Sequence, residues 1–303
     1  MNTNWKKKRV WWLALLLIIG VLSIFPLNHI SKAEFSYNGT HKKIIWKFDP
    51  QTGVLDISGT GALVGADKEG VDYPWEGEWG TYITTVNIAE GITEIGWGVF
   101  NDCHNIVEIN IPDSVKTIGA AFDDCMKLEN IYISKNVTKI NGFLGGENLK
   151  NIFVSAKNKN YSSKNGVLFN KEMTILEQYP SGNKRTTYKI PKGVKTIGAS
   201  SFGCALFLKQ VIIPKSVQTI ESRAFCDARA LIHVTIPGSV KSIKYGAFED
   251  CINLQTVSFS KGLLKIGTYA LQDVTGSFPS KSPKVFVVLV RGHLRGVRCY
   301  EMS

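Results

Sequence analysis

The chain has 303 residues, of which 44% are hydrophobic and 20% are charged, a globular composition that excludes an intrinsically disordered protein. Its net charge of +11 comes mainly from the two ends, because residues 34–275 hold 26 basic and 24 acidic groups. A nearly neutral body lacks the basic stripe that nucleic-acid binding requires. We therefore do not expect a nucleic acid as a partner.

Residues 1–33 have the pattern of a signal peptide. Basic residues at 6–9 precede an apolar run at 10–25, and Ser31 and Ala33 are the small residues that favour cleavage after Ala33. The apolar run is 16 residues long, which is short for a bilayer span of about 20 residues. We expect a protein that is secreted or held at the surface of a bacterium. Retention as an uncleaved anchor is the alternative, and it is the only membrane contact that the sequence indicates.

Residues 34–85 predict a β-rich N-terminal cap. Two strand-like runs, 44–48 and 54–57, are joined by a Pro- and Gly-containing turn. A solenoid exposes its first apolar face unless another element covers it, and a hairpin would do so.

Two acidic residues in this cap, Glu76 and Glu78, lie between Trp75 and Trp79. A paired acid and base beside aromatic rings is the pattern of a glycosidase or a sugar platform. Both carboxylates stand on one loop, however, so they do not face each other across a cleft. We favour a structural role for this loop, with sugar binding as the minor alternative.

Residues 86–275 carry a repeat of about 23 residues, which predicts a solenoid whose coils bury their apolar faces only against each other. A strand-ending apolar residue recurs in seven copies with spacings of 23, 22, 57, 23, 23 and 23 residues, at Ile88, Ile111, Ile133, Ile190, Ile213, Ile236 and Phe259. Within each strand, alternation places apolar residues inward and the intervening residues outward.

Two further columns follow each strand. The first is bulky and predicts a stacked aromatic spine, at Phe100, Phe122, Phe143, Phe202, Phe225, Phe248 and Leu271. The second holds small residues and is expected to be a buried packing site, at Cys103, Cys125, Gly146, Ala205, Ala228, Cys251 and Val274. A disulfide between Cys103 and Cys125 on adjacent coils is the minor alternative.

The full pattern is Leu-x-x-Val-x-Ile-Pro-x-x-Val-x-x-Ile followed by Phe-x-x-Cys-x-x-Leu, and it resembles the leucine-rich repeats of BspA-like bacterial surface proteins. The resemblance covers roughly residues 88–271. It implies an α/β leucine-rich-repeat solenoid of the horseshoe class, here dominated by β-structure with short helical turns and about seven coils. It also implies a secreted or surface-displayed interaction protein without enzymatic activity, and it carries over no functional residues.

Two segments depart from the repeat. The 57-residue spacing holds an insertion at about 155–189, which we interpret as a divergent coil with a protruding hairpin whose β-rich runs flank a four-residue turn. Residues 276–303 form a divergent basic tail without repeat character.

No catalytic or metal site stands out. The five histidines lack neighbouring ligands at metal-binding spacing. An aspartate column at Asp102, Asp124, Asp227 and Asp250 could bind calcium between coils, but exposed turn-capping residues are the simpler interpretation. We therefore expect no cofactor, no metal and no enzyme activity.

The candidate ligand site lies on the outward strand positions. Most are polar, but Tyr132, Phe153 and Ile212 are apolar, with Asn130, Asn151 and His233 beside them. Either the inserted hairpin folds over the aromatic residues as a satellite core, or they form an exposed patch that anchors a partner. The expected partner is a protein of the host matrix or of another cell surface, and the alternative is a cell-wall glycan.

Overall fold

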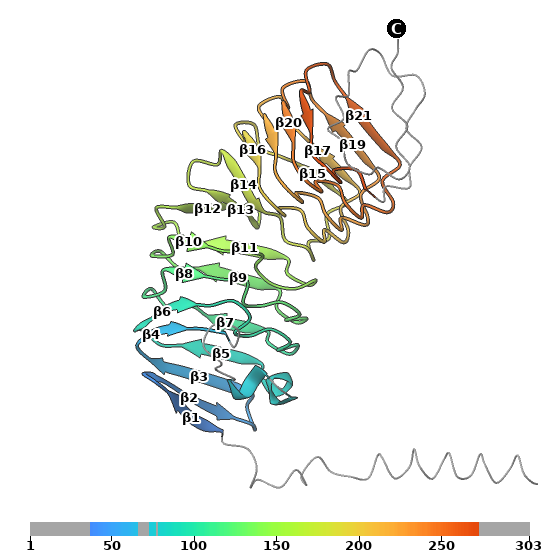
Figure 1. The fold of residues 1–303 in the computed structure, drawn as a ribbon. Coiled ribbons are helices and arrows are strands. Elements are labelled where there is room, and N and C mark those ends of the chain that lie inside the picture. The colour runs from blue at the N-terminus through green and yellow to red at the C-terminus, as the bar shows by residue number, and fades with distance from the viewer. Residues whose placement is uncertain (1–36, 66–72, 77, 273–303) are drawn as a thin grey trace, which may run out of the picture. The chain divides into compact units, whose positions relative to one another are not determined.

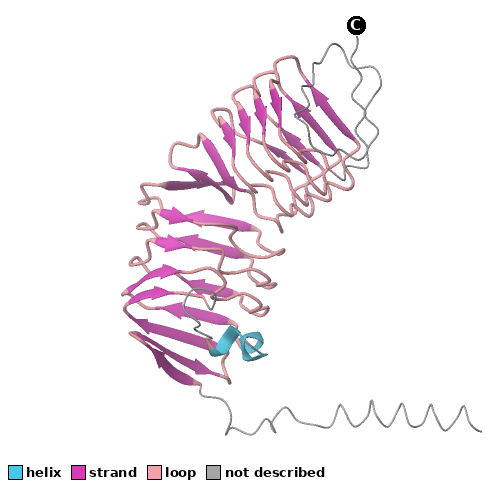
Figure 2. Ribbon diagram, viewed as in Figure 1, coloured by secondary structure: helices cyan, strands magenta, loops and turns pink. Residues whose placement is uncertain are grey.

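The computed structural model describes residues 37–65, 73–76 and 78–272, and all of these except Tyr37 belong to one compact unit, Asn38–Ser303. The described chain winds into a β-solenoid, as the repeat predicted (Figure 1). Its only helical elements in those residues are the 3₁₀ helices η2 (Pro74–Glu76) and η3 (Glu78–Tyr82) (Figure 2). The expected signal peptide and the tail at 276–303 lie outside the described residues.

Each repeat contributes one longer strand, which we call a main strand. The main strands fall into three sheets, and within each sheet neighbouring main strands pair in parallel with a shift of one repeat, so that Gln210 faces His233 and His233 faces Thr256. This register confirms the 23-residue period. The main strands are β3 (Val54–Gly59), β5 (Thr85–Ile88), β7 (Glu108–Asn110), β9 (Asn130–Ile133), β11 (Asn151–Val154), β15 (Thr187–Lys189), β17 (Gln210–Ile212), β19 (His233–Ile236) and β21 (Thr256–Phe259).

A shorter strand returns along the opposite side of each coil. These short strands also pair in parallel between neighbouring coils, for example Thr219 with Ser242. They are β4 (Gly61–Leu63), β6 (Ile92–Ile95), β8 (Thr117–Ile118), β10 (Lys139–Ile140), β16 (Thr196–Ile197), β18 (Thr219–Ile220), β20 (Ser242–Ile243) and β22 (Lys265–Ile266). Hydrogen-bonded turns connect the two strands, where we expected short helical turns.

The N-terminal strands extend the sheet of main strands. The two expected strands are present as β2 (Ile44–Asp49) and β3, which pair antiparallel, and β1 (Asn38–His41) adds to the outer edge of β2. β3 then pairs in parallel with β5, so the hairpin is continuous with the first coil. Its inward side chains Ile44, Phe48 and Leu55 are buried against the core.

The insertion forms three strands, β12 (Tyr161–Lys164), β13 (Val167–Asn170) and β14 (Ile175–Gln178). β13 pairs antiparallel with both neighbours, and β14 continues in parallel into β16, the next short strand. The hairpin of β13 and β14 is the expected one, but it does not protrude. Val167, Leu168 and Phe169 are buried, because the insertion is built into the sheet of short strands.

The aromatic spine runs through the interior. Phe100 and Phe122 stack at 5.8 Å between ring centroids, and Phe225 and Phe248 stack at 4.9 Å. The prediction was wrong at Phe143, which is only partly buried, while the adjacent Leu144 is fully buried. The next ring in the spine comes from the insertion, where Tyr179 stacks on Phe202 at 5.2 Å.

Candidate functional site

The centre of the candidate site is an exposed aromatic pair on β9 and β11. Parallel register places Tyr132 directly beside Phe153, and their rings stack at 4.9 Å with an interplanar angle of 23°. Tyr132 is 61% exposed and Phe153 is 38% exposed. Both point outward, because the alternate residues Ile131 and Ile152 fill the core.

A pair of amides lies beside these rings. Asn130 and Asn151 face each other in the same register, and the Asn151 Nδ2 donates to Asn130 Oδ1 at 2.9 Å. Each amide keeps further hydrogen-bonding capacity, since an amide offers two donors and an acceptor. The rings and amides together combine exposed apolar area with orienting polar groups on neighbouring strands.

The insertion does not cover the aromatic pair, so the satellite-core interpretation is wrong. The turn between β12 and β13 lies beside β11, where the Ile152 N–H donates to the Gly166 carbonyl at 2.9 Å. The same turn approaches Asn151 so closely that a Cβ on Gly166 would lie 2.5 Å from the Asn151 Oδ1. The insertion therefore adds along the edge of the strand, and Phe153 stays exposed.

The other two predicted residues lie in a different sheet. Ile212 is 42% exposed on β17, between Lys189 and Thr235 of the adjoining strands. His233 lies on β19, and its Nδ1 hydrogen-bonds the hydroxyl of Thr256. The sheet of β15, β17, β19 and β21 is separate from the pair of β9 and β11. Four of the six predicted residues are thus brought together, whereas Ile212 and His233 belong to the other sheet.

The polar surface next to the pair extends further than the sequence indicated. Asn110 Nδ2 donates to Asn87 Oδ1, and Asn87 Nδ2 donates to Asp56 Oδ1, both at 2.9 Å. These three residues occupy the outward column of β3, β5 and β7. The column could have been followed back from Asn110 by the 23-residue period, but Asp56 belongs to the cap, where the repeat consensus is weak.

The aspartate column has a backbone explanation. Asp102, Asp124, Asp227 and Asp250 all adopt left-handed backbone conformations, with φ between 54° and 61°. Aspartate tolerates this region better than most residues. The calcium alternative has little support, because Asp227 Oδ1 is held by Arg229 at 3.0 Å.

One cluster near this column has metal-ligand chemistry. Ligand atoms of Cys226, Asp227 and Asp250 lie within 4.8 Å of one another. Burial raises the pKa of the Cys226 thiol to about 11, with the nearby Asp227 and Glu249 carboxylates adding to the shift. The Asp227 carboxylate of this cluster is already engaged by the Arg229 guanidinium, so we assign no metal to it.

The buried cysteines pack as predicted. Cys103, Cys125 and Cys251 are fully buried, and none of these three described cysteines forms a disulfide. The Cys125 thiol donates to the Phe100 carbonyl at 3.2 Å, and the Cys251 thiol donates to the Phe225 carbonyl at 3.0 Å. Burial raises the pKa of the Cys125 and Cys251 thiols well above the ordinary value, which favours the neutral thiol as a packing group.

One of the two rings suggested as a sugar platform, Trp75, is buried and cannot contact a sugar. Trp75 is 1% exposed, stacks on Tyr73 at 4.6 Å, and donates its indole N–H to the Val99 carbonyl at 2.8 Å. It therefore closes the interior of the first coil. The side chains of Glu76, Glu78 and Trp79 lie outside the described residues.

No helix in the described ranges has the length and apolarity needed to span a membrane.

Comparisons with known proteins agree with this architecture. The family model of the BspA type leucine rich repeat region matches residues 79–175 and 174–278, with 6 copies. A leucine-rich repeat protein from Eubacterium ventriosum is 29% identical with a TM-score of 0.53, and the match covers 77% of this chain and 74% of that one. No curated protein gave a match.

The pneumococcal vaccine antigen PcpA is also similar, with 25% identity and a TM-score of 0.58. That match covers 63% of this chain and 49% of the antigen, so the chain corresponds to about half of that protein.

Proposed function

The chain belongs to the family of BspA-type leucine-rich repeat proteins, and we propose that it is a protein-binding module secreted from a bacterium or displayed on its surface. Repeats of this kind provide extended surfaces for protein interaction. A vaccine antigen among the similar structures and the signal-peptide pattern of residues 1–33 support a location outside the cell. The proposal includes adhesion to a host matrix protein or to another cell, without a catalytic step.

The observation that carries the proposal is the exposed stack of Tyr132 and Phe153. Two large rings in contact offer apolar area at low entropic cost, because stacking already restricts their rotamers. Aromatic residues at the centre of interfaces often dominate the binding energy. Asn130 and Asn151 would supply the directional hydrogen bonds at the rim, and the outward amides of Asn87 and Asn110 would extend it.

A double variant tests this site. Tyr132→Ala with Phe153→Ala is expected to weaken binding of the full chain to its protein partner at least about tenfold, since hot-spot truncations cost about 2 kcal/mol or more. Binding would be measured by biolayer interferometry against a panel of purified host matrix proteins. The control is Ile252→Ala with Leu264→Ala, which removes two exposed apolar side chains elsewhere in the array. Wild-type affinity in the Tyr132 and Phe153 variant, or equal losses in both variants, would rule out the aromatic pair as the anchor.

A carbohydrate-binding role in the cell wall is the second candidate. Stacked rings beside amides also suit a sugar, whose apolar face packs on an aromatic ring while its hydroxyls bond to amides. The same two variants assayed against purified cell wall separate the candidates. Loss of binding to wall material alone would favour the sugar, and loss of binding to a matrix protein would favour the protein-binding module.

A further inference from the structure

The body of the chain is nearly neutral overall, but acidic and basic residues are concentrated in different segments of it. Residues 34–149 hold 8 basic and 17 acidic groups, whereas residues 150–220 hold 12 basic and 2 acidic groups. The net charges of these two segments nearly cancel in the total. A local excess of one sign creates a field that neutral totals do not reveal, and it acts on partners of the opposite sign.

Some of the excess positive charge lies along one edge of the solenoid, at the turns that lead from each main strand to the next short strand. This row of lysines continues into the later coils. The outward residues Lys189, Ile212, Thr235 and Ser258 lie in register along β15, β17, β19 and β21. In three of these four coils a lysine follows three residues later, at Lys192, Lys215 and Lys261. Glycine holds the equivalent place in the remaining coil. There the Lys241 ammonium donates to the Gly238 carbonyl at 3.1 Å and to the Gly262 carbonyl at 3.2 Å, so its charge fills the gap in the row.

We call this row the lysine edge and define it by Lys192, Lys195, Lys215, Lys241 and Lys261. All five side chains are exposed. The loops that carry them, 191–195, 214–218, 237–241 and 260–264, contain no acidic residue. In the described part of the chain none of the five forms an ion pair. Neighbouring coils are about 4.8 Å apart, so the charges repeat at short, regular intervals.

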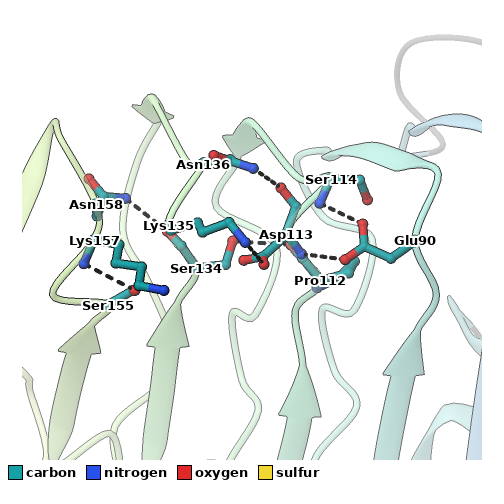
Figure 3. A network of polar contacts seen from close by, with 10 residues as sticks. All are labelled: Glu90, Pro112, Asp113, Ser114, Ser134, Lys135, Asn136, Ser155, Lys157 and Asn158. Atoms are coloured by element: carbon teal, nitrogen blue, oxygen red, sulfur yellow. Dashed lines mark hydrogen bonds and ion pairs between the residues drawn. The ribbon is translucent and has the colours of Figure 1, made fainter.

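On the same edge of the early coils, charged side chains have hydrogen-bond or ion-pair partners within the protein (Figure 3). The Glu90 carboxylate accepts from the backbone N–H groups of Asp113 at 3.1 Å and Ser114 at 2.9 Å. Asp113 in turn pairs with Lys135. Glu90, Asp113 and Lys135 thus have partners within the protein, whereas none of the five lysine-edge ammonium groups forms an ion pair in the described residues.

We infer that the lysine edge binds a linear anionic polysaccharide, one that carries a charged group on most of its repeating units. Unpaired like charges in one row repel each other, and a polyanion laid along the row would remove that repulsion. Ammonium groups are strong, flexible donors to sulfate, phosphate or carboxylate oxygens. The regular spacing of the coils matches a polymer with a regular charge repeat better than a single small anion.

The composition of the edge argues against nucleic acid. Single-stranded nucleic acid binds where basic grooves carry aromatic side chains on which bases stack, and the four loops contain no aromatic residue. They also contain no arginine, which is the usual residue for reading base edges. The edge offers charge without stacking or base recognition, which suits a polymer whose units are sugars.

A charge-matched pair of variants tests the inference. The first variant combines Lys192→Gln, Lys215→Gln and Lys261→Gln, and the control combines Lys116→Gln, Lys127→Gln and Lys139→Gln on the early coils. Both lose three positive charges and keep similar side-chain length. Lys116 holds the repeat position of Lys195 and Lys241, so the control also asks whether that position binds when the rest of the row is missing. The full-length chains would be compared on immobilised heparin, a sulfated polysaccharide, across a salt gradient and by titration. Melting curves of both variants would verify that each is folded.

We expect wild type and control to bind heparin with affinities within about twofold, and the lysine-edge variant to bind at least about tenfold more weakly, because each exposed charge contact contributes modestly and three are lost. Binding should weaken as salt rises. Failure of the wild type to bind, equal weakening of both variants, or binding of duplex DNA as tight as that of heparin would each overturn the inference. Because Tyr132 and Phe153 are untouched, these results are independent of the protein-binding test.

Discussion

At the scale of single residues, the coils depend on left-handed backbone at two recurring positions. One position holds Gly98, Ser200, Arg223, Gly246 and Tyr269, and the other holds the aspartate column and Cys204. Positive φ values interrupt helical hydrogen bonding, which explains why the chain forms single turns at these points and does not extend them into helices. A side chain in this region strains the backbone by about 1–2 kcal/mol, except where glycine removes the Cβ.

Reciprocal substitutions at equivalent positions test this strain. Ser200→Gly is expected to raise the free energy of unfolding by about 0.5–1 kcal/mol, because relief of strain exceeds the added entropy of the unfolded chain. Gly98→Ala is expected to lower it by about 1 kcal/mol. A Cβ at Gly98 would meet only the Asn101 side chain at 3.8 Å, so no clash contributes. Chemical denaturation would measure both, and a stabilising Gly98→Ala would contradict the strain argument.

At the scale of elements, the sequence predicted which side chains of the repeat coils are buried, but it did not predict how the insertion packs. Each column of the repeat is sampled several times, so Val211 and Val234 could be placed inward without any tertiary information. Tyr179 could not be placed in the aromatic spine, because the 57-residue spacing breaks the alignment on which the column depends. The exposure of Phe153 was equally undecidable, since it depends on where the insertion lies relative to β11.

One of the contacts that attach the insertion to the preceding coils is made by a buried side chain that imitates the main chain, Gln178. Gln178 Oε1 accepts from the Leu144 N–H at 2.9 Å, and Gln178 Nε2 donates to the Leu144 carbonyl at 2.8 Å. Gln178 is 3% exposed, so water does not substitute for either bond. This amide therefore continues the hydrogen bonding between coils at a point where no strand pairing is available.

Replacing this amide should destabilise the junction between β10 and β14. Gln178→Leu is expected to lower the free energy of unfolding by about 2–4 kcal/mol, because it leaves a buried N–H and a buried carbonyl without partners. The exposed Gln210 provides the control, and Gln210→Leu should change stability by less than about 0.5 kcal/mol. Denaturant unfolding of both variants gives the comparison. Equal effects would show that the Gln178 bonds contribute nothing beyond the loss of a glutamine.

At the scale of the whole molecule, the two proposed surfaces differ in how far the sequence predicted them. Tyr132, Phe153 and their flanking asparagines were identified from alternation alone, because outward positions of a strand are expected to be polar. The lysine edge was overlooked because charge was counted over the entire body, where the acidic early coils cancel the basic middle coils. The charge of a repeat protein has to be counted separately for each repeat position, because equivalent positions of successive coils lie in a row on the surface.

The same repetition determines how stability should depend on length. Each coil contacts only its neighbours, so each contributes its own stability and one interface. Chains that end at Ile266, Ile243 and Ile220, at equivalent points of β22, β20 and β18, should therefore melt at successively lower temperatures. The shortest leaves Phe202 without the ring of Phe225, on which it stacks at 4.7 Å, and is the most prone to aggregate. Thermal denaturation followed by circular dichroism measures the series. Identical midpoints for all three chains would mean that the coils do not support one another, contrary to a solenoid with one continuous core.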